Sequence, residues 1–454
     1  MKQFKSNIHG DDRIVNRKIK EEFSLKNATL FGGYNLFSDY LASNGLDRGL
    51  QKELEAMKAP WATYSMPVIC RTIIDGYCLG LENLYQFESI ENDPLISAKH
   101  GLAKLPDQTV LRKDLINKFR SDEDVNRLRR IKTTQVKKEL KRLKGNLVLE
   151  YDSTVQTGYG NQEGLEIGYN PHKPGRASYH PQLCRERKSA LSVWSRLRTG
   201  DTVSSTDFIE FLDESWQVIP NRFKRKKNGF CKVLKRMDSG YESEDILSWN
   251  ERHGVGYVIK MNMRGDLWSK IFSVPIQAYH KVITGVGEVE VCSFRFKRKA
   301  WSKERRVVMV RWKDEVDRAQ TKLFDALGYT YSFFITNLKW DEQDIYRFYD
   351  KRADIENHIR EAKYDFHIDH ISTDSFHANA ADFELKLLAL NQMILFCKKI
   401  LNLDSPRHFA STVRRRWLLI PAKLRKGGHQ LILKLSNVFS YRDAWPGYRQ
   451  NFVT

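Results

Sequence analysis

Residues 147–152, Leu-Val-Leu-Glu-Tyr-Asp, form a short apolar run that ends in a carboxylate. A run of this length is typical of a strand buried in a sheet. Residues 230–237 form a second such run, which leads into Asp238 and a Ser-Gly turn. A helix pattern over 243–253 and a strand pattern over 256–261 follow. Strand, helix and strand in this order predict a mixed α/β sheet.

The composition describes a large folded chain. It has 454 residues, of which 41% are apolar and 12% aromatic. This length predicts two to four domains, and this apolar content excludes a disordered tail, a collagen or a small disulfide scaffold. The six cysteines form no Cys-x-x-Cys pair. A zinc site or a disulfide framework is therefore not expected, and a reducing cytoplasm fits.

The charge points to a polyanionic partner. The formal net charge is +20, which favours nucleic acid first and an anionic membrane surface second. The longest apolar stretch, 383–401, is interrupted by charged and amide side chains, so no membrane span is expected. The first residues are polar and predict no signal peptide. We therefore expect a DNA-binding protein without a membrane partner.

Four regions follow from the local patterns. Residues 1–145 are predicted to be a mostly helical DNA-binding or dimerisation region, and 146–261 the first part of an α/β core. Residues 262–340 are rich in strand-forming residues, apart from a helix signal over 315–327, and predict a β-rich insertion. Residues 341–454 begin with helix patterns over 341–365 and 378–401 and end in a basic tail. The base-rich run 122–144 is either a solvated helix face or a phosphate-contacting arm.

Three carboxylates stand out by position. Asp152 and Asp238 each close a strand, and Glu356 lies within a predicted helix. Each carboxylate alone has an ordinary explanation as a cap or turn residue. A carboxylate at the end of a buried strand must be solvated, paired or metal-bound. Together they suit two Mg²⁺ ions about 4 Å apart for in-line phosphoryl transfer. We expect Mn²⁺ to substitute.

The helix around Glu356 carries a polar stripe. Tyr349, Arg352, Glu356 and Lys363 are separated by 3, 4 and 7 residues, which places them on one side of a continuous helix. An apolar stripe beside them would pack on the core. The stripe is either a surface salt-bridge ladder, with Arg352 and Glu356 at i and i+4, or part of a catalytic site.

The same spacing resembles the Tyr-Arg-Glu-Lys signature of DDE transposases from bacterial cut-and-paste insertion sequences. Residues 150–155, Glu-Tyr-Asp-Ser-Thr-Val, and 236–241, Arg-Met-Asp-Ser-Gly-Tyr, look like the first two carboxylate blocks of that family. Residues 168–176, Gly-Tyr-Asn-Pro-His-Lys-Pro-Gly-Arg, together with 178–181, Ser-Tyr-His-Pro, are similar to a signature of the insertion-sequence family numbered 1380. The blocks occur in the family's order and cover about 147–440.

The resemblance implies an RNase H-like catalytic core interrupted by a β-rich insertion, in the 118 residues that separate Asp238 from Glu356. It implies that Asp152, Asp238 and Glu356 hold the metal ions that cut transposon ends and join them to target DNA, through hairpin intermediates. Tyr349, Arg352 and Lys363 would contact phosphates near the scissile bond. A hairpin needs an unstacked base, for which Trp312 and Trp340 are candidates, although each is also readable as an ordinary packing residue.

The loop after Asp152 is a second candidate for DNA contact. His172, Lys173, Arg176 and His180 lie in a segment rich in Pro and Gly. The segment reads either as a rigid turn between strands or as a DNA-facing loop beside the metals.

The expected partners are double-stranded DNA, as terminal inverted repeats and target, and a second copy of the chain on paired ends. We expect a bacterial, cytoplasmic, nucleoid-associated protein. Two alternatives stay open: a metal-dependent DNA endonuclease on the same fold without strand transfer, and a non-catalytic domesticated DNA-binding protein.

Overall fold

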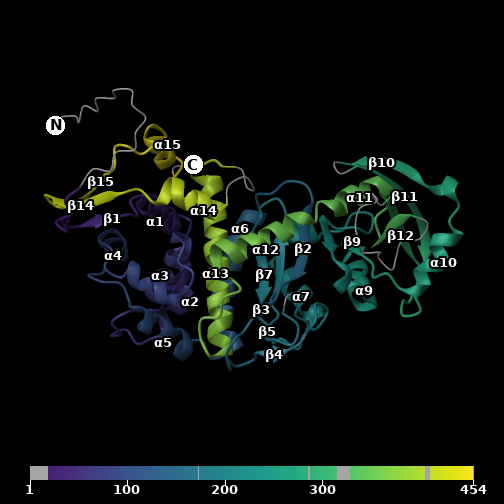
Figure 1. The fold of residues 1–454 in the computed structure, drawn as a ribbon, viewed down its shortest axis with the longest axis horizontal. Helices are drawn as coiled ribbons and strands as arrows, with labels where there is room; N and C mark the ends of the chain where they lie inside the picture. Colours follow the sequence, from purple (N-terminus) through teal and green to yellow (C-terminus); the bar gives the residue numbers. More distant parts are fainter. Residues whose placement is uncertain (1–18, 172, 285–286, 314–327, 404–408, 453–454) are drawn as a thin grey trace.

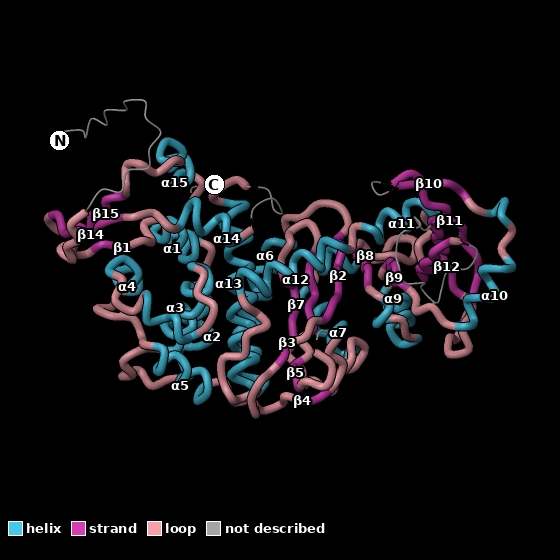
Figure 2. The backbone as a smooth tube through the Cα atoms, viewed as in Figure 1, coloured by secondary structure: helices cyan, strands magenta, loops and turns pink. Residues whose placement is uncertain are grey.

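The computed structural model describes residues 19–171, 173–284, 287–313, 328–403 and 409–452. Its centre is a nine-stranded mixed sheet in the order β10-β11-β12-β13-β9-β8-β2-β6-β7. Helices from both ends of the chain lie beyond one end of this sheet, and the strands β10–β12 form its other end (Figure 1). Figure 2 shows the strands in magenta and the helices in cyan in the same view.

Five strands of the sheet have the RNase H-like arrangement. The strands β2 (Leu147–Ser153), β6 (Gln182–Glu186) and β7 (Ser192–Arg196) form an antiparallel meander. The strands β8 (Val233–Met237) and β9 (Gly256–Lys260) join β2 in parallel. The predicted α/β fold with an RNase H-like core is confirmed, and β2 lies at its centre.

The insertion continues the same sheet. After α10 (Gly265–Ser273) come β10 (His280–Thr284), β11 (Gly287–Phe296), β12 (Arg305–Lys313) and β13 (Tyr329–Thr336). These strands pair antiparallel in chain order, and β13 pairs with β9. The predicted helix over 315–327 lies outside the described residues.

Helices cover the remaining core. The first third of the chain contains α1 (Tyr34–Ser43), α2 (Leu46–Leu54), α3 (Met66–Leu79), α4 (Pro94–His100), α5 (Gln108–Lys118) and α6 (Asp122–Leu140). The long helix α13 (Phe376–Lys399) packs against α3, α6 and β7. It therefore connects the N-terminal helices to the sheet (Figure 1). The described helices include none long and apolar enough to cross a membrane.

The helix predicted over 341–365 is wrong as a single element. The structure has α11 (Glu342–Asp350) and α12 (Ala353–Phe366), with a turn at Lys351 and Arg352. The turn is fixed by tertiary contacts, since the buried Arg236 donates a 2.6 Å hydrogen bond to the Phe348 carbonyl. Tyr349 therefore belongs to a different helix from Glu356 and Lys363.

Several short elements complete the chain. Around the core lie α7 (Phe208–Val218), α8 (Asn221–Lys224) and α9 (Glu244–His253), and a small sheet β3-β5-β4 from Gln156–Thr157, Ala177–Tyr179 and Glu166–Ile167. Beyond α14 (Ala410–Val413), the predicted basic tail is folded. Its strands β14 (Ala422–Gly427) and β15 (Gln430–Leu435) form a hairpin, β1 (Ala28–Thr29) pairs with β14, and α15 (Trp445–Gln450) follows.

Candidate active site

Asp152 and Asp238 reach the same edge of the sheet. Asp152 lies near the end of β2, and Asp238 follows directly after β8. The two strands are parallel neighbours in which Glu150 is opposite Arg236, so the two aspartates occupy equivalent positions one pleat further along. The helix α12 contributes Glu356 to the same place. Side chains 86 and 118 residues apart in the chain are thereby brought together.

The guanidinium of Arg352 lies between the three carboxylates. Its Nη2 is 2.9 Å from Asp152 Oδ2 and 3.9 Å from Asp238 Oδ2, and its Nη1 is 2.8 Å from Glu356 Oε1. The Arg352 side chain is only 11% exposed. One buried cation therefore ties together residues from β2, from the end of β8 and from α12.

Backbone hydrogen bonds orient the two aspartates. Asp152 Oδ1 accepts the Ser153 N–H at 2.9 Å, and Asp238 Oδ1 accepts the Gly240 N–H at 3.0 Å. In each case the other oxygen, Oδ2, is the one that faces Arg352. The aspartates thus present one oxygen each to a shared space.

The site opens to solvent from one side. The exposed fraction of the side chains rises from 14% for Asp152 to 35% for Asp238 and 62% for Glu356. The pKa of Asp152 is raised to about 7, mainly by burial and also by the nearby Asp238 and Glu356, against the opposing charge of Arg352. Negative charge is therefore concentrated here beyond what Arg352 neutralises.

The arrangement fits a divalent cation in its donor set. Among the residues that the structure describes, no group of three or more His, Cys, Asp or Glu side chains forms a ready-made metal site. The three carboxylates instead surround the Arg352 guanidinium, whose positive charge takes the place of a metal ion. Carboxylate oxygens are the ligands that Mg²⁺ and Mn²⁺ prefer. The residues present would suit such an ion once Arg352 moved away.

Tyr349 and Lys363 flank the carboxylates from either side of Glu356. The Tyr349 ring packs on Phe334 with centroids 4.5 Å apart, and burial raises the pKa of its hydroxyl. Burial lowers the pKa of Lys363, while Asp369 and Asp152 act in the opposite direction. Both residues lie close enough to the carboxylates for the negative charges to raise their pKa values.

The loop after Asp152 divides into an outer and an inner part. The outer residues Lys173 and Arg176 lie over the Tyr159 ring, 4.7 and 6.0 Å from its centroid, and His172 lies outside the described residues. The inner residue His180 is buried, with Nδ1 2.7 Å from the Thr202 carbonyl and Nε2 3.1 Å from Ser153 Oγ. His180 therefore packs beneath the aspartate strand, and only the outer part faces solvent.

The two candidate tryptophans are packing residues of the sheet extension. Trp312 on β12 and Trp340 before α11 are both partly buried against the same apolar cluster. The rings of Trp340 and Phe348 meet edge to face at 5.5 Å. The structure brings neither into a described contact with the carboxylates.

Sequence reasoning missed a buried ion network beneath the site. Arg236 and Glu150, both 0% exposed, form an ion pair in which Arg236 Nε is 2.7 Å from Glu150 Oε1. Arg185 also pairs with Glu150, and Asp354 on α12 pairs with Arg187 and Arg236. The available signal was the strand period of two, because Glu150 and Arg236 each precede an aspartate by two residues on the same face.

Comparisons with known proteins show the family to which the chain belongs. The family model for the transposase DDE domain group 1 matches residues 12–450. Curated protein sequences give no match. Among solved structures, the chain is similar to the piggyBac transposase synaptic complex with hairpin DNA, at 8% identity and a TM-score of 0.45, over 83% of this chain and 78% of that one. Because the family model spans nearly the whole chain, the protein belongs to the DDE transposases of domain group 1.

Proposed function

We propose that the protein cuts the ends of an insertion sequence and joins them to target DNA, with Asp152, Asp238 and Glu356 as the metal ligands. The observation that carries the proposal is the convergence of these three carboxylates on one buried cation. Two bound Mg²⁺ ions would activate the attacking hydroxyl and stabilise the leaving oxygen. The carboxylates themselves would hold the site and take no covalent part.

Arg352 has two successive partners in this proposal. In the free protein it neutralises the carboxylates. On DNA its guanidinium would move to a phosphate oxygen, for which its forked donors are equally suited. Lys363 would add a point charge next to the scissile phosphate, and Tyr349 a hydroxyl.

The finer identity rests on the sequence blocks. The blocks at 150–155, 168–176 and 236–241 and the Tyr-Arg-Glu-Lys spacing support membership of the insertion-sequence family numbered 1380 and a bacterial, nucleoid-associated protein. The hairpin intermediate is proposed on the same resemblance, with Trp312 or Trp340 to support the unstacked base. A homodimer on paired ends follows from the need to bring two ends together.

The predicted regions give a division of labour. We propose that 1–145 serves DNA binding and dimerisation, that 146–261 and 341–454 form the catalytic core, and that 262–340 carries DNA contacts next to the site. The exposed Lys173 and Arg176 support a DNA-facing role for the loop between β4 and β5. His172 would lie in the same loop.

The test is an assay that separates cleavage from joining. A labelled DNA duplex that carries the element's end is incubated with a plasmid, Mg²⁺ and the protein. The wild type should nick the end and join it to the plasmid. Asp152→Asn, Asp238→Asn and Glu356→Gln should each lower cleavage at least 1000-fold and leave metal-free end binding intact.

Asp344→Asn, an exposed carboxylate at the start of α11, is the matched control and should cleave normally. Cleavage without joining would assign the endonuclease alternative. Binding without metal-dependent nicking would assign the non-catalytic one. Normal cleavage by any of the three carboxylate variants would remove that residue from the site.

A further inference from the structure

The C-terminal part of the chain presents a group of exposed cations that form no ion pair with the residues that the structure describes. Residues 409–454 contain one acidic residue, Asp443, and Arg442 pairs with it. Six exposed cations form what we call the C-terminal basic surface: Arg415, Arg416, Lys423, Arg425, Lys426 and Lys434. Within the described part of the chain, none of the six takes part in an ion pair. This surface therefore lacks the compensation that most surface charges have.

The register of the hairpin places like charges together. Lys423 on β14 is directly opposite Lys434 on β15, and Arg425 is opposite the exposed Ile432. These residues share one face of the hairpin, because side chains alternate along a strand. The other face carries Leu424 and Leu433, which are partly buried. Like charges directly opposite each other destabilise a sheet, and an external anion would relieve that cost.

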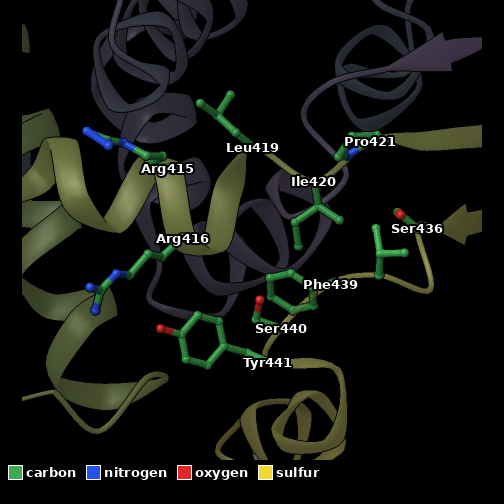
Figure 3. Close-up of a pocket in the computed structure, with 10 residues that line it drawn as sticks. Arg415, Arg416, Leu419, Ile420, Pro421, Ser436, Phe439, Ser440 and Tyr441 are labelled. Carbon is green, nitrogen blue, oxygen red and sulfur yellow. The ribbon is translucent and has the colours of Figure 1, made fainter. Parts of the chain in front are cut away.

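A cavity continues the surface toward α14. It has a volume of about 380 Å³, and Arg415 and Arg416 lie at its edge. Figure 3 shows Arg416 on the same side of the view as Tyr441, with Ile420 and Phe439 nearer its middle. The Tyr441 ring stacks on Trp417 at 4.9 Å. A lining that combines apolar side chains with two arginines suits a sugar–phosphate unit, which has one apolar and one anionic side.

The geometry points to this surface as a second DNA contact, separate from the catalytic centre, that holds the backbone of duplex DNA. The inference rests on the proposed function for its choice of DNA as the polyanion. Lys423 and Arg425, on one face of β14, are about 7 Å apart. Over that distance a DNA strand presents more than one phosphate. In Figure 1 β14 and β15 lie at the opposite end of the molecule from β10–β12. Contacts at this end would extend the footprint on DNA well beyond the bond that is cut.

The test uses the salt dependence of DNA binding without metal. Lys423→Gln/Arg425→Gln/Lys434→Gln is compared with Arg225→Gln/Lys232→Gln/Arg252→Gln, which removes three exposed cations near the start of β8 and the end of α9. Each lost phosphate contact lowers the slope of log K against log salt by about 0.9. We expect the hairpin variant to lose about 2 to 3 units of slope and at least tenfold in affinity near 0.1 M salt. The control variant should keep both within about twofold, and equal melting midpoints would establish that all three proteins are folded.

The outcomes distinguish this inference from the proposed function. Equal losses in the hairpin and control variants would overturn the inference, because net charge alone would then explain them. Normal DNA binding by the hairpin variant with lost binding to vesicles of anionic phospholipid would assign the surface to a membrane and also overturn it. Failure of the wild type to bind duplex DNA would instead contradict the proposed function. The end-cleavage assay, which compares the wild type with the carboxylate variants, tests the three carboxylates and not the C-terminal basic surface.

Discussion

Arg352 is the residue on which the free protein's active site depends. Three carboxylates with no cation between them would repel one another in a partly buried space. The guanidinium removes that repulsion and holds Asp152 and Glu356 at hydrogen-bond distance. A divalent ion would have to compete with it for the same oxygens. Arg352 thus stabilises the three carboxylates in the free protein, and in our proposal it opposes metal binding until DNA offers it a phosphate.

Replacing Arg352 should separate these two effects. Arg352→Gln removes the competing charge, so the affinity of the DNA-free protein for Ca²⁺ or Tb³⁺ should rise at least fivefold, while end cleavage with Mg²⁺ should fall at least 100-fold. Titration calorimetry or Tb³⁺ luminescence measures the first effect. The control is Arg360→Gln. Arg360 is an exposed arginine of α12 whose side chain donates a hydrogen bond to Asn357. Unchanged or weaker cation binding in Arg352→Gln would show that the guanidinium does not compete.

At the scale of elements, the buried pair Glu150–Arg236 connects the strands to the helix turn. Glu150 lies on β2 and Arg236 on β8, and Arg236 also bonds the Phe348 carbonyl at the end of α11. Asp354 at the start of α12 is 3.5 Å from the same guanidinium. The network therefore fixes the turn that carries Arg352 relative to the two strands that carry the aspartates.

A double-mutant cycle should reveal this connection. Arg236→Met leaves a buried carboxylate with less compensation and should cost about 3–5 kcal/mol in the free energy of unfolding. Glu150→Leu combined with Arg236→Met should cost less than the sum of the single changes, by about 1–3 kcal/mol. The exposed pair Lys281–Glu288 serves as the control cycle and should show a coupling below about 1 kcal/mol. Additive costs at the buried pair, measured by urea unfolding, would contradict its role.

A second carboxylate on α12 predicts how stability depends on pH. Burial raises the pKa of Glu361 to about 7, with help from Asp365, although the Ala410 N–H hydrogen bond favours the charged form. Below its unfolded pKa, near 4.5, the group is neutral in both states. Between about 4.5 and 7 only the unfolded chain ionises, so the wild type should lose up to about 3 kcal/mol of stability as the pH rises.

Glu361→Gln should flatten that decline, since glutamine cannot ionise. Urea unfolding at pH 5 and pH 8 measures it, with the exposed Glu88→Gln as control. An equal decline in the wild type and in Glu361→Gln would show that another group is responsible.

The sequence predicts elements well where local pattern and tertiary contacts agree. The strand at 147–152, the helix at 243–253 and the strands of the insertion lie where hydrophobic pattern and turn residues place them. The break at Lys351 and Arg352 carries no local signal, because no Gly or Pro lies there and the contact that fixes it comes from Arg236. The folded C-terminal hairpin was missed because its charges hide the alternation of Leu424, Leu433 and Leu435.

The sequence predicts which residues form the candidate site, but it does not predict how these residues are arranged in the free protein. Strand-end position singles out Asp152 and Asp238, and spacing singles out Glu356 and Arg352. Spacing gives no indication that Arg352 lies among the carboxylates, since that depends on the turn between α11 and α12. For the buried Glu150–Arg236 pair the strand period was the only available signal, and it was missed because neither residue type is expected at 0% exposure.

At the scale of the whole molecule, the carboxylates and the C-terminal basic surface divide two tasks. The centre of the molecule holds the three carboxylates that we propose as metal ligands, and the end formed by β1, β14 and β15 offers cations that form no ion pair among the described residues (Figure 1). The helix α13 packs on both the N-terminal helices and the sheet, so it couples these parts mechanically. DNA held at one end would thereby be positioned relative to the site at the centre.

The central claim is that Asp152, Asp238 and Glu356 form one cation-binding centre on DNA. The most direct measurement is anomalous diffraction from crystals of the protein bound to an end duplex and soaked in Mn²⁺. We predict Mn²⁺ peaks within about 2.5 Å of oxygens from all three carboxylates, with the Arg352 guanidinium moved onto a DNA phosphate. A DNA-bound structure in which any one of the three carboxylates lies out of reach of the shared ions would contradict the account.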